Sequence, residues 1–225
     1  MDFDIKLKQK HYKKGRFNEK EKLLSEFKKD NITQDLNEIK QITHEYISFQ
    51  SAYINSFKEI VLPKKNEVLS IRTQRQLNIF TFFLKMIEQN GSIDYLSIQT
   101  YTFDQKTLVA LYSLLEENKI KNLQIIMTET AMFRIPKIYA QLKDLFSNHK
   151  RCNLVFYWVH SKVNLIESGG NKYVLDGSGN FSMNAQIEHY NLFNSEKMFD
   201  FDKEWQNEFL FKELKRKKHE IYKNF

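Results

Sequence analysis

Two short pairs of residues in this chain carry side chains that handle phosphate. His160 and Lys162 are two residues apart, and Ser178 and Asn180 are two residues apart directly after Gly177. In an extended chain, residues two apart point the same way, so each pair is expected to present its side chains together. A histidine can act as nucleophile or base, a lysine supplies positive charge, and serine and asparagine donate hydrogen bonds. The two pairs therefore predict a site that binds or attacks phosphate.

Glycines are concentrated in the same region. Four of the six glycines in the chain fall between the two pairs or within the second pair: Gly169, Gly170, Gly177 and Gly179. Glycine permits tight turns and a close approach of backbone to a ligand. We therefore expect a hairpin turn near residue 169 and a ligand close to the backbone near residue 178.

These residues resemble the signature of the phospholipase D superfamily. That signature is His-x-Lys, then four residues and an aspartate, followed by Gly-Ser-x-Asn or a similar run. Here His160, Lys162, Gly177 and the pair that follows it match, and Glu167 stands where the family has aspartate. The interval from Glu167 to Gly177 is longer than in the family, and the Ser-Gly-Gly-Asn turn at 168–171 can absorb the extra residues.

The resemblance implies a reaction as well as a fold. It implies that His160 attacks phosphorus to form a phosphohistidine, which water then resolves, without a metal or other cofactor. Lys162 and Asn180 would hold the non-bridging oxygens, and Ser178 would add a hydrogen bond. A second histidine must protonate the leaving group, and family members with one motif per chain obtain it by dimerising. The resemblance therefore implies a homodimer with one composite site.

A nucleophilic histidine needs an acceptor that holds its remote ring nitrogen. We favour Glu188, which resembles the downstream carboxylate of the family, with Glu167 and Asp176 as rivals. Glu167 is expected to support the site through an ion pair or hydrogen bond. His189 could be a second acid, although a histidine in an aromatic strand is more often structural. Further residues at predicted strand ends could line the cleft: Arg72, Gln99, Tyr101, Glu129 and Thr130.

Composition favours a soluble protein with an anionic partner. The 225 residues carry a formal charge of +7, with basic runs near both ends. Nucleic acid is the first candidate partner and a membrane surface the second, although such runs are also typical of solvated helix faces. Cys152 is the single cysteine, so no disulfide can form within the chain. With no signal segment or membrane-spanning run visible, we expect a cytoplasmic location and no stable membrane association.

The order of apolar and polar segments predicts two parts. Residues 1–62 are expected to form a basic N-terminal arm and a long amphipathic helix from Leu36 that ends before Pro63. Residues 63–225 are expected to form a phospholipase D-like α/β domain. In it, strands at 68–72, 94–101, 122–128 and 152–159 alternate with helices at 74–89, 105–118 and 136–148.

The alternation of strands and helices predicts a mostly parallel sheet with helices on both faces. The chain should continue with a short helix or turn at 184–188, a strand at 189–193 and a helix at 203–222. Ligands of open α/β sheets bind at the carboxyl ends of the strands, and His160 follows the strand at 152–159. The fold expected from the pattern thus places the histidine where a ligand should bind.

The sequence leaves three functions open. A metal-independent nuclease acting on DNA or RNA is favoured by the motif and the basic charge. A protein that keeps the fold and binds nucleic acid with weak or no turnover is the main alternative. A lipid phosphodiesterase is less favoured, because no apolar membrane-binding loop or secretion signal is visible.

Overall fold

The computed structural model describes residues 36–57, 60–73, 77–182 and 187–223. The predicted N-terminal basic arm and most of the short element expected at 184–188 lie outside these residues. The chain divides into two compact units, residues 1–39 and 40–225. Every site discussed below lies in the second unit.

The first described helix, α2 (Leu36–Asn55), forms the amphipathic element that the apolar stripe predicts. Its Ile54 is buried in the main core, and the Tyr46 hydroxyl lies 2.7 Å from Thr107 Oγ1. The helix ends at Asn55, earlier than expected, and the Asn55 amide oxygen accepts a hydrogen bond from Lys85 at 2.6 Å. Tyr46, Ile47 and Tyr53 of α2 also pack against the main core, and the helix beyond Ile39 belongs to the second unit.

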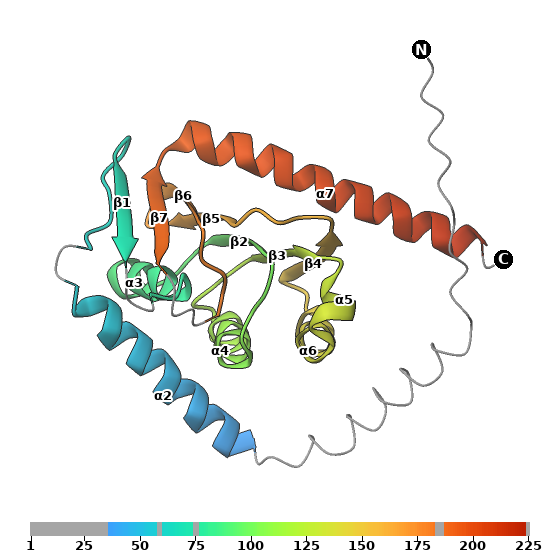
Figure 1. The fold of residues 1–225 in the computed structure, drawn as a ribbon, viewed down its shortest axis with the longest axis horizontal. Coiled ribbons are helices and arrows are strands. Elements are labelled where there is room, and N and C mark those ends of the chain that lie inside the picture. The colour runs from blue at the N-terminus through green and yellow to red at the C-terminus, as the bar shows by residue number, and fades with distance from the viewer. Residues whose placement is uncertain (1–35, 58–59, 74–76, 183–186, 224–225) are drawn as a thin grey trace. The chain divides into compact units, whose positions relative to one another are not determined.

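Seven strands form one mixed sheet (Figure 1). They are β1 (Val68–Thr73), β2 (Tyr95–Thr100), β3 (Leu123–Thr128), β4 (Cys152–Tyr157), β5 (Val163–Ser168), β6 (Asn171–Gly177) and β7 (Glu188–Asn194). Their order across the sheet is β1-β7-β6-β5-β2-β3-β4. Only β2, β3 and β4 run parallel to one another, and the other four neighbouring pairs are antiparallel.

The expectation of a mostly parallel sheet is therefore wrong. Gly169 and Gly170 take positive φ angles of 57° and 75° in a tight turn, which makes β5 and β6 an antiparallel hairpin. β7 then returns beside β6. β1 pairs antiparallel with β7 at the far edge of the sheet, four positions from β2. The pattern identifies the strands, but it does not determine which neighbour each strand selects.

Helices cover both faces of the sheet, as predicted (Figure 1). α3 (Phe80–Asn90), α4 (Gln105–Glu116) and α6 (Pro136–Phe146) lie on one side, and α7 (Glu196–Lys223) crosses the other. Asp104 begins α4 by accepting a hydrogen bond from the Thr107 backbone N–H at 2.7 Å, and Pro136 begins α6. A four-residue helix, α5 (Ala131–Arg134), follows β3 and was not predicted.

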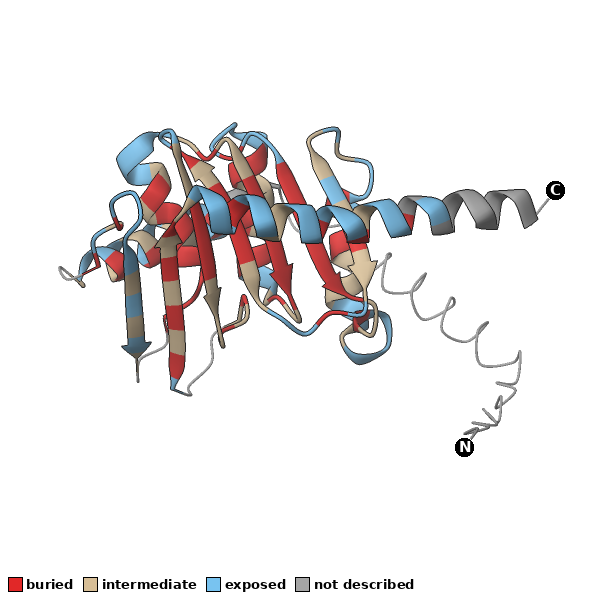
Figure 2. Ribbon diagram, turned by 90° about the horizontal axis from the view of Figure 1, so that it is seen from above, coloured by how far each residue is buried: buried red, intermediate tan, exposed pale blue. Residues whose placement is uncertain are grey.

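The larger core lies between the sheet and the helices α2, α3, α4 and α6, and two smaller apolar clusters include residues of α7. Figure 2 shows buried residues on the strands that α7 crosses. One of these contains Ile126, Val155 and Phe209, and the other contains Leu165, Val174 and Phe199. Burying apolar surface on both faces fixes the positions of the strand ends that carry the candidate site.

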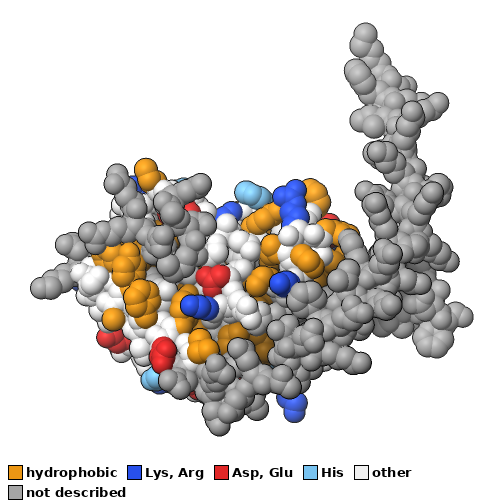
Figure 3. Space-filling model, turned by 60° about the horizontal axis from the view of Figure 1, so that its bottom comes forward, with side chains coloured by type: hydrophobic (Ala, Val, Ile, Leu, Met, Phe, Trp, Pro, Cys, Tyr) orange, Lys and Arg blue, Asp and Glu red, His pale blue; other side chains and the backbone are white. Residues whose placement is uncertain are grey.

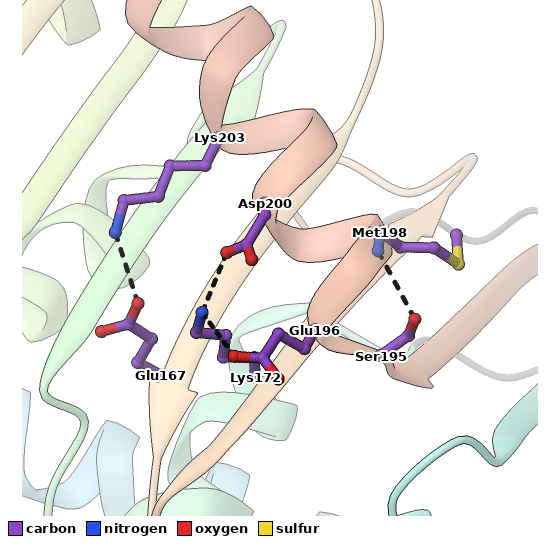
Figure 4. A network of polar contacts seen from close by, with 7 residues as sticks. All are labelled: Glu167, Lys172, Ser195, Glu196, Met198, Asp200 and Lys203. Atoms are coloured by element: carbon purple, nitrogen blue, oxygen red, sulfur yellow. Dashed lines mark hydrogen bonds and ion pairs between the residues drawn. The ribbon is translucent and has the colours of Figure 1, made fainter.

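Polar contacts also hold α7 on the sheet (Figure 4). Lys172 of β6 forms ion pairs with Glu196 at 3.1 Å and Asp200 at 2.9 Å. Lys203 lies 3.3 Å from Glu167 of β5. Among the described residues, no helix is long and apolar enough to cross a membrane.

Candidate phosphate site

One end of the sheet gathers segments that are far apart in the sequence. It contains the carboxyl ends of β2, β3 and β4. From β2, the strands β5, β6 and β7 follow in alternating directions. The same end of the sheet therefore also contains the start of β5, the end of β6 and the start of β7. The connection 158–162 runs from the outer strand β4 to β5, and β3 and β2 lie between these strands in the sheet. His160 and Lys162 are thus carried across the carboxyl edge.

His160 and Lys162 lie in this connection, after the end of β4 and before the start of β5. Gln99, fully buried near the end of β2, donates a hydrogen bond from its side-chain amide to Ser161 Oγ. The exposed His160 ring lies beside Tyr101, with 5.4 Å between ring centroids. The end of β2 therefore positions the segment that the sequence motif singled out.

The Lys162 ammonium contacts the backbone of His160, and its pKa is affected by burial and by two nearby side chains. Its Nζ donates to the His160 carbonyl at 3.0 Å. Partial burial lowers the pKa of Lys162, and the carboxylate of Glu188 and the Tyr101 phenol oppose that shift. The cation is thus held near Glu188 while part of its hydration is lost.

The Gly-Ser-x-Asn segment lies beside this lysine. The Gly177 backbone N–H donates to the Lys162 carbonyl at 3.3 Å, which joins the two halves of the motif directly. Asn180 Oδ1 accepts from the Thr100 hydroxyl at 3.4 Å, so the end of β2 also holds this side chain. The structure therefore brings His160, Lys162 and the Gly177–Asn180 segment to one edge of the sheet.

Ser178 and Glu188 are bonded to each other. The Ser178 hydroxyl donates to Glu188 Oε2, and the same oxygen of Ser178 accepts from the His189 backbone N–H at 3.0 Å. Glu188 is buried at the start of β7. The sequence favoured Glu188 as the acceptor for the His160 ring, and one oxygen of its carboxylate accepts from Ser178.

The two rival carboxylates lie elsewhere. Asp176 is at the same end of the sheet, where it accepts a hydrogen bond from the Asn191 amide at 3.0 Å. Glu167 pairs with Tyr95 near the opposite end of β5, and its partner is Lys203 of α7. Glu167 thus forms the ion pair expected of a supporting residue, although it does so away from His160.

The glycines of the motif make room for β7. A Cβ atom at Gly177 would fall on the His189 carbonyl, and one at Gly179 would fall on the Tyr190 side chain. The Tyr190 hydroxyl donates to the Leu77 carbonyl at 2.7 Å, so this ring is fixed. At these glycines the backbone approaches β7 closely, whereas the sequence suggested a close approach to a ligand.

The sequence did not identify every residue of the site, and some of the residues it suggested lie away from His160. Thr100 was not identified, and neither was Arg134, which donates to the Tyr101 hydroxyl at 2.6 Å. Among the predicted cleft residues, Gln99 and Tyr101 lie at the site. Arg72 lies opposite His189 in the β1–β7 ladder and bonds to the Ile71 carbonyl. Glu129 and Thr130 line a groove described below.

Charged groups on the surface are dispersed. Figure 3 shows one face on which the described lysine and arginine side chains lie in small separate groups between apolar ones. Within the described part of the chain, no cluster of three or more His, Cys, Asp and Glu side chains could hold a metal ion.

Comparisons with known proteins give only distant similarities. No protein-family model matches the chain, and no curated protein matches it. TrmBL2, an archaeal chromatin protein whose structure shows a novel mode of DNA binding, is similar over 87% of this chain and 69% of its own, at 11% identity and a TM-score of 0.45. Polyphosphate kinase from Porphyromonas gingivalis is similar over 60% of this chain and 22% of its own, at 12% identity and a TM-score of 0.43. At these TM-scores neither similarity assigns a family or an activity.

Proposed function

We propose that this chain is a metal-independent phosphodiesterase of the phospholipase D type, acting as a nuclease on DNA or RNA. The observation that supports this most strongly is the direct contact between the two halves of the motif. The backbone bond from Gly177 to Lys162 places the Ser178 and Asn180 side chains next to the segment that carries His160. Histidine, lysine, serine and asparagine are the groups that such a displacement at phosphorus needs.

In the proposed reaction, a His160 ring nitrogen attacks phosphorus and the bond to the leaving oxygen breaks. A second imidazolium donates its proton to that oxygen, and water then cleaves the phosphorus–nitrogen bond. Lys162 and Asn180 stabilise the non-bridging oxygens during both steps. Glu188 acts by positioning Ser178 and by balancing the charge of Lys162.

The second histidine is proposed to come from another copy of the chain. His160 is exposed, so it can face His160 of the partner subunit across a two-fold axis. One composite site then serves both chains of a homodimer.

Cleavage of labelled DNA and RNA oligonucleotides in excess chelator tests the proposal. The wild type is expected to cleave, and His160→Ala is expected to lose activity by roughly 10³-fold or more. His44→Ala, an exposed histidine of α2, serves as the matched control and should retain activity. Intact substrate with wild type and His160→Ala alike would overturn the proposal.

A nucleic-acid-binding protein without turnover is the second candidate. Two observations favour it: the Ser178 hydroxyl is bonded to Glu188, and Glu167 is ion-paired with Lys203 away from the motif. Binding that weakens with salt and survives His160→Ala, with no cleavage by either protein, would select this candidate.

A further inference from the structure

Two large aromatic side chains are exposed beside the candidate site. Trp158, two residues before His160, has 74% of its surface exposed, and Phe133 of α5 has 63% exposed. Both line one groove along the outer strand β4, together with Met132, Tyr139, Leu154 and Phe156. Exposed apolar surface of this kind is typical of a binding site.

Residues that line the groove are close in sequence to residues of the phosphate site. Trp158 belongs to the same connection between β4 and β5 as His160. Arg134, next to Phe133 in the chain, donates to the Tyr101 hydroxyl and lies 6.0 Å from the centre of that ring. Tyr101 in turn lies beside the His160 ring. A ligand whose phosphate reaches His160 can therefore extend over Trp158.

Charges of both signs lie in and near the groove. Lys143 of α6 lines it, and Arg134 lies between it and the site. The carboxylates of Glu129 and Glu213 also line it, and Glu213 is buried. The C-terminal part of α7 approaches this edge of the sheet, because Phe209 stacks on Tyr157 of β4 with 4.7 Å between ring centroids.

We propose that Trp158 and Phe133 stack unpaired nucleobases, so that the site takes single-stranded nucleic acid. Exposed aromatic rings beside cationic groups bind single strands because every base has a π face. In a duplex those faces are already stacked within the helix. This inference rests on the proposed function and specifies the substrate class of that site.

Equilibrium binding to three oligonucleotides of equal phosphate number tests the inference: a single strand, its duplex and an abasic strand. All proteins carry His160→Ala, so that no substrate is cleaved. The single strand is expected to bind at least about tenfold more tightly than the abasic strand. Trp158→Ala should remove most of that ratio and Trp158→Phe should keep it, while Phe49→Ala, an exposed aromatic residue of α2, is the matched control.

Equal affinity for the single strand and the abasic strand would overturn the inference, as would an unchanged ratio in Trp158→Ala. A preference for the duplex would also overturn it. Binding that does not depend on the bases, together with binding to a protein or a lipid vesicle, would overturn it as well. The readout is the ratio of two affinities measured on the same protein. A smaller folded fraction in a variant lowers both affinities equally and leaves their ratio unchanged. Base-dependent binding by the His160→Ala proteins, together with no cleavage by the wild type, would support the inference and contradict the proposed nuclease activity.

Discussion

The charge of Lys162 depends on its partly buried position. Burial lowers the pKa of this lysine below the ordinary value of 10.5, although Glu188 and Tyr101 limit the shift. Below its pKa the ammonium is charged and can hold a phosphate oxygen, and above it the charge is lost. The residue should therefore lose function at a lower pH than an exposed lysine would.

We expect this titration to appear in the alkaline limb of a pH profile. The kcat/KM of the wild type should fall with a midpoint below 10.5, the ordinary lysine value. In Lys162→Arg the guanidinium stays charged, so any remaining activity should show no such fall. Oligonucleotide cleavage measured from neutral to strongly alkaline pH provides the profile. An alkaline limb that is identical in both proteins would contradict this role of Lys162.

Gly179 should be intolerant of a side chain. In Gly179→Ala the new Cβ would meet the Tyr190 ring and hydroxyl, and that ring is fixed by Leu77. Overpacking of this kind costs about 1–3 kcal/mol of unfolding free energy. Urea denaturation of Gly179→Ala measures the cost, and Tyr190→Phe in the same chain should recover part of it. Stability equal to that of the wild type would contradict the packing described here.

The main residues of the site could be predicted because they lie within a short stretch of sequence. His160, Lys162 and the Gly177–Asn180 segment are brought together by two adjoining strands, so their spacing is informative. Thr100 and Arg134 could not be found in this way. The contact of Thr100 spans 80 positions and that of Arg134 spans 33. Such contacts depend on how strands are ordered in the sheet, which local patterns do not encode.

At the scale of elements, α7 is anchored to the centre of the sheet by one buried side chain. The Gln206 amide oxygen accepts from the Ser97 hydroxyl, and its amide nitrogen donates to the Val163 carbonyl at 3.1 Å. Gln206 is fully buried, and Val163 is the first residue of β5, directly after Lys162. The helix thus holds the strand that begins at the site.

Gln206→Ala is expected to destabilise the fold by about 1–3 kcal/mol, because it removes a partner from the buried Ser97 hydroxyl and from the Val163 carbonyl. Glu208→Ala, which removes an exposed ion pair with Lys212, should cost less than about 0.5 kcal/mol. Chemical denaturation of the two variants compares these values. A cost for Gln206→Ala as small as that of Glu208→Ala would refute the anchoring role.

The elements themselves were more predictable than their arrangement. The alternation of apolar and polar segments identified β1 to β4, β7, α4 and α6, and apolar spacing identified α2 and most of α7. The direction of pairing was not predictable, since each antiparallel partner is chosen by packing across the whole sheet. A strand such as β1 lies at one edge of the sheet and β2 lies four positions away, although they follow one another in the chain.

The proposed reaction requires two copies of the chain. One chain supplies one complete motif, and the proposed reaction needs a nucleophilic histidine and a second histidine that acts as acid. The two His160 side chains of a homodimer would fill both roles. Replacing His160 in one of the two chains should then disable the single composite site.

A heterodimer with one wild-type chain and one His160→Ala chain tests this claim most directly. Two affinity tags, one on each co-expressed chain, allow it to be purified free of both homodimers. The account predicts cleavage in chelator by the wild-type homodimer and at most a small percentage of that activity in the heterodimer. Half of the wild-type activity in the heterodimer, or full activity in a monomer, would contradict it.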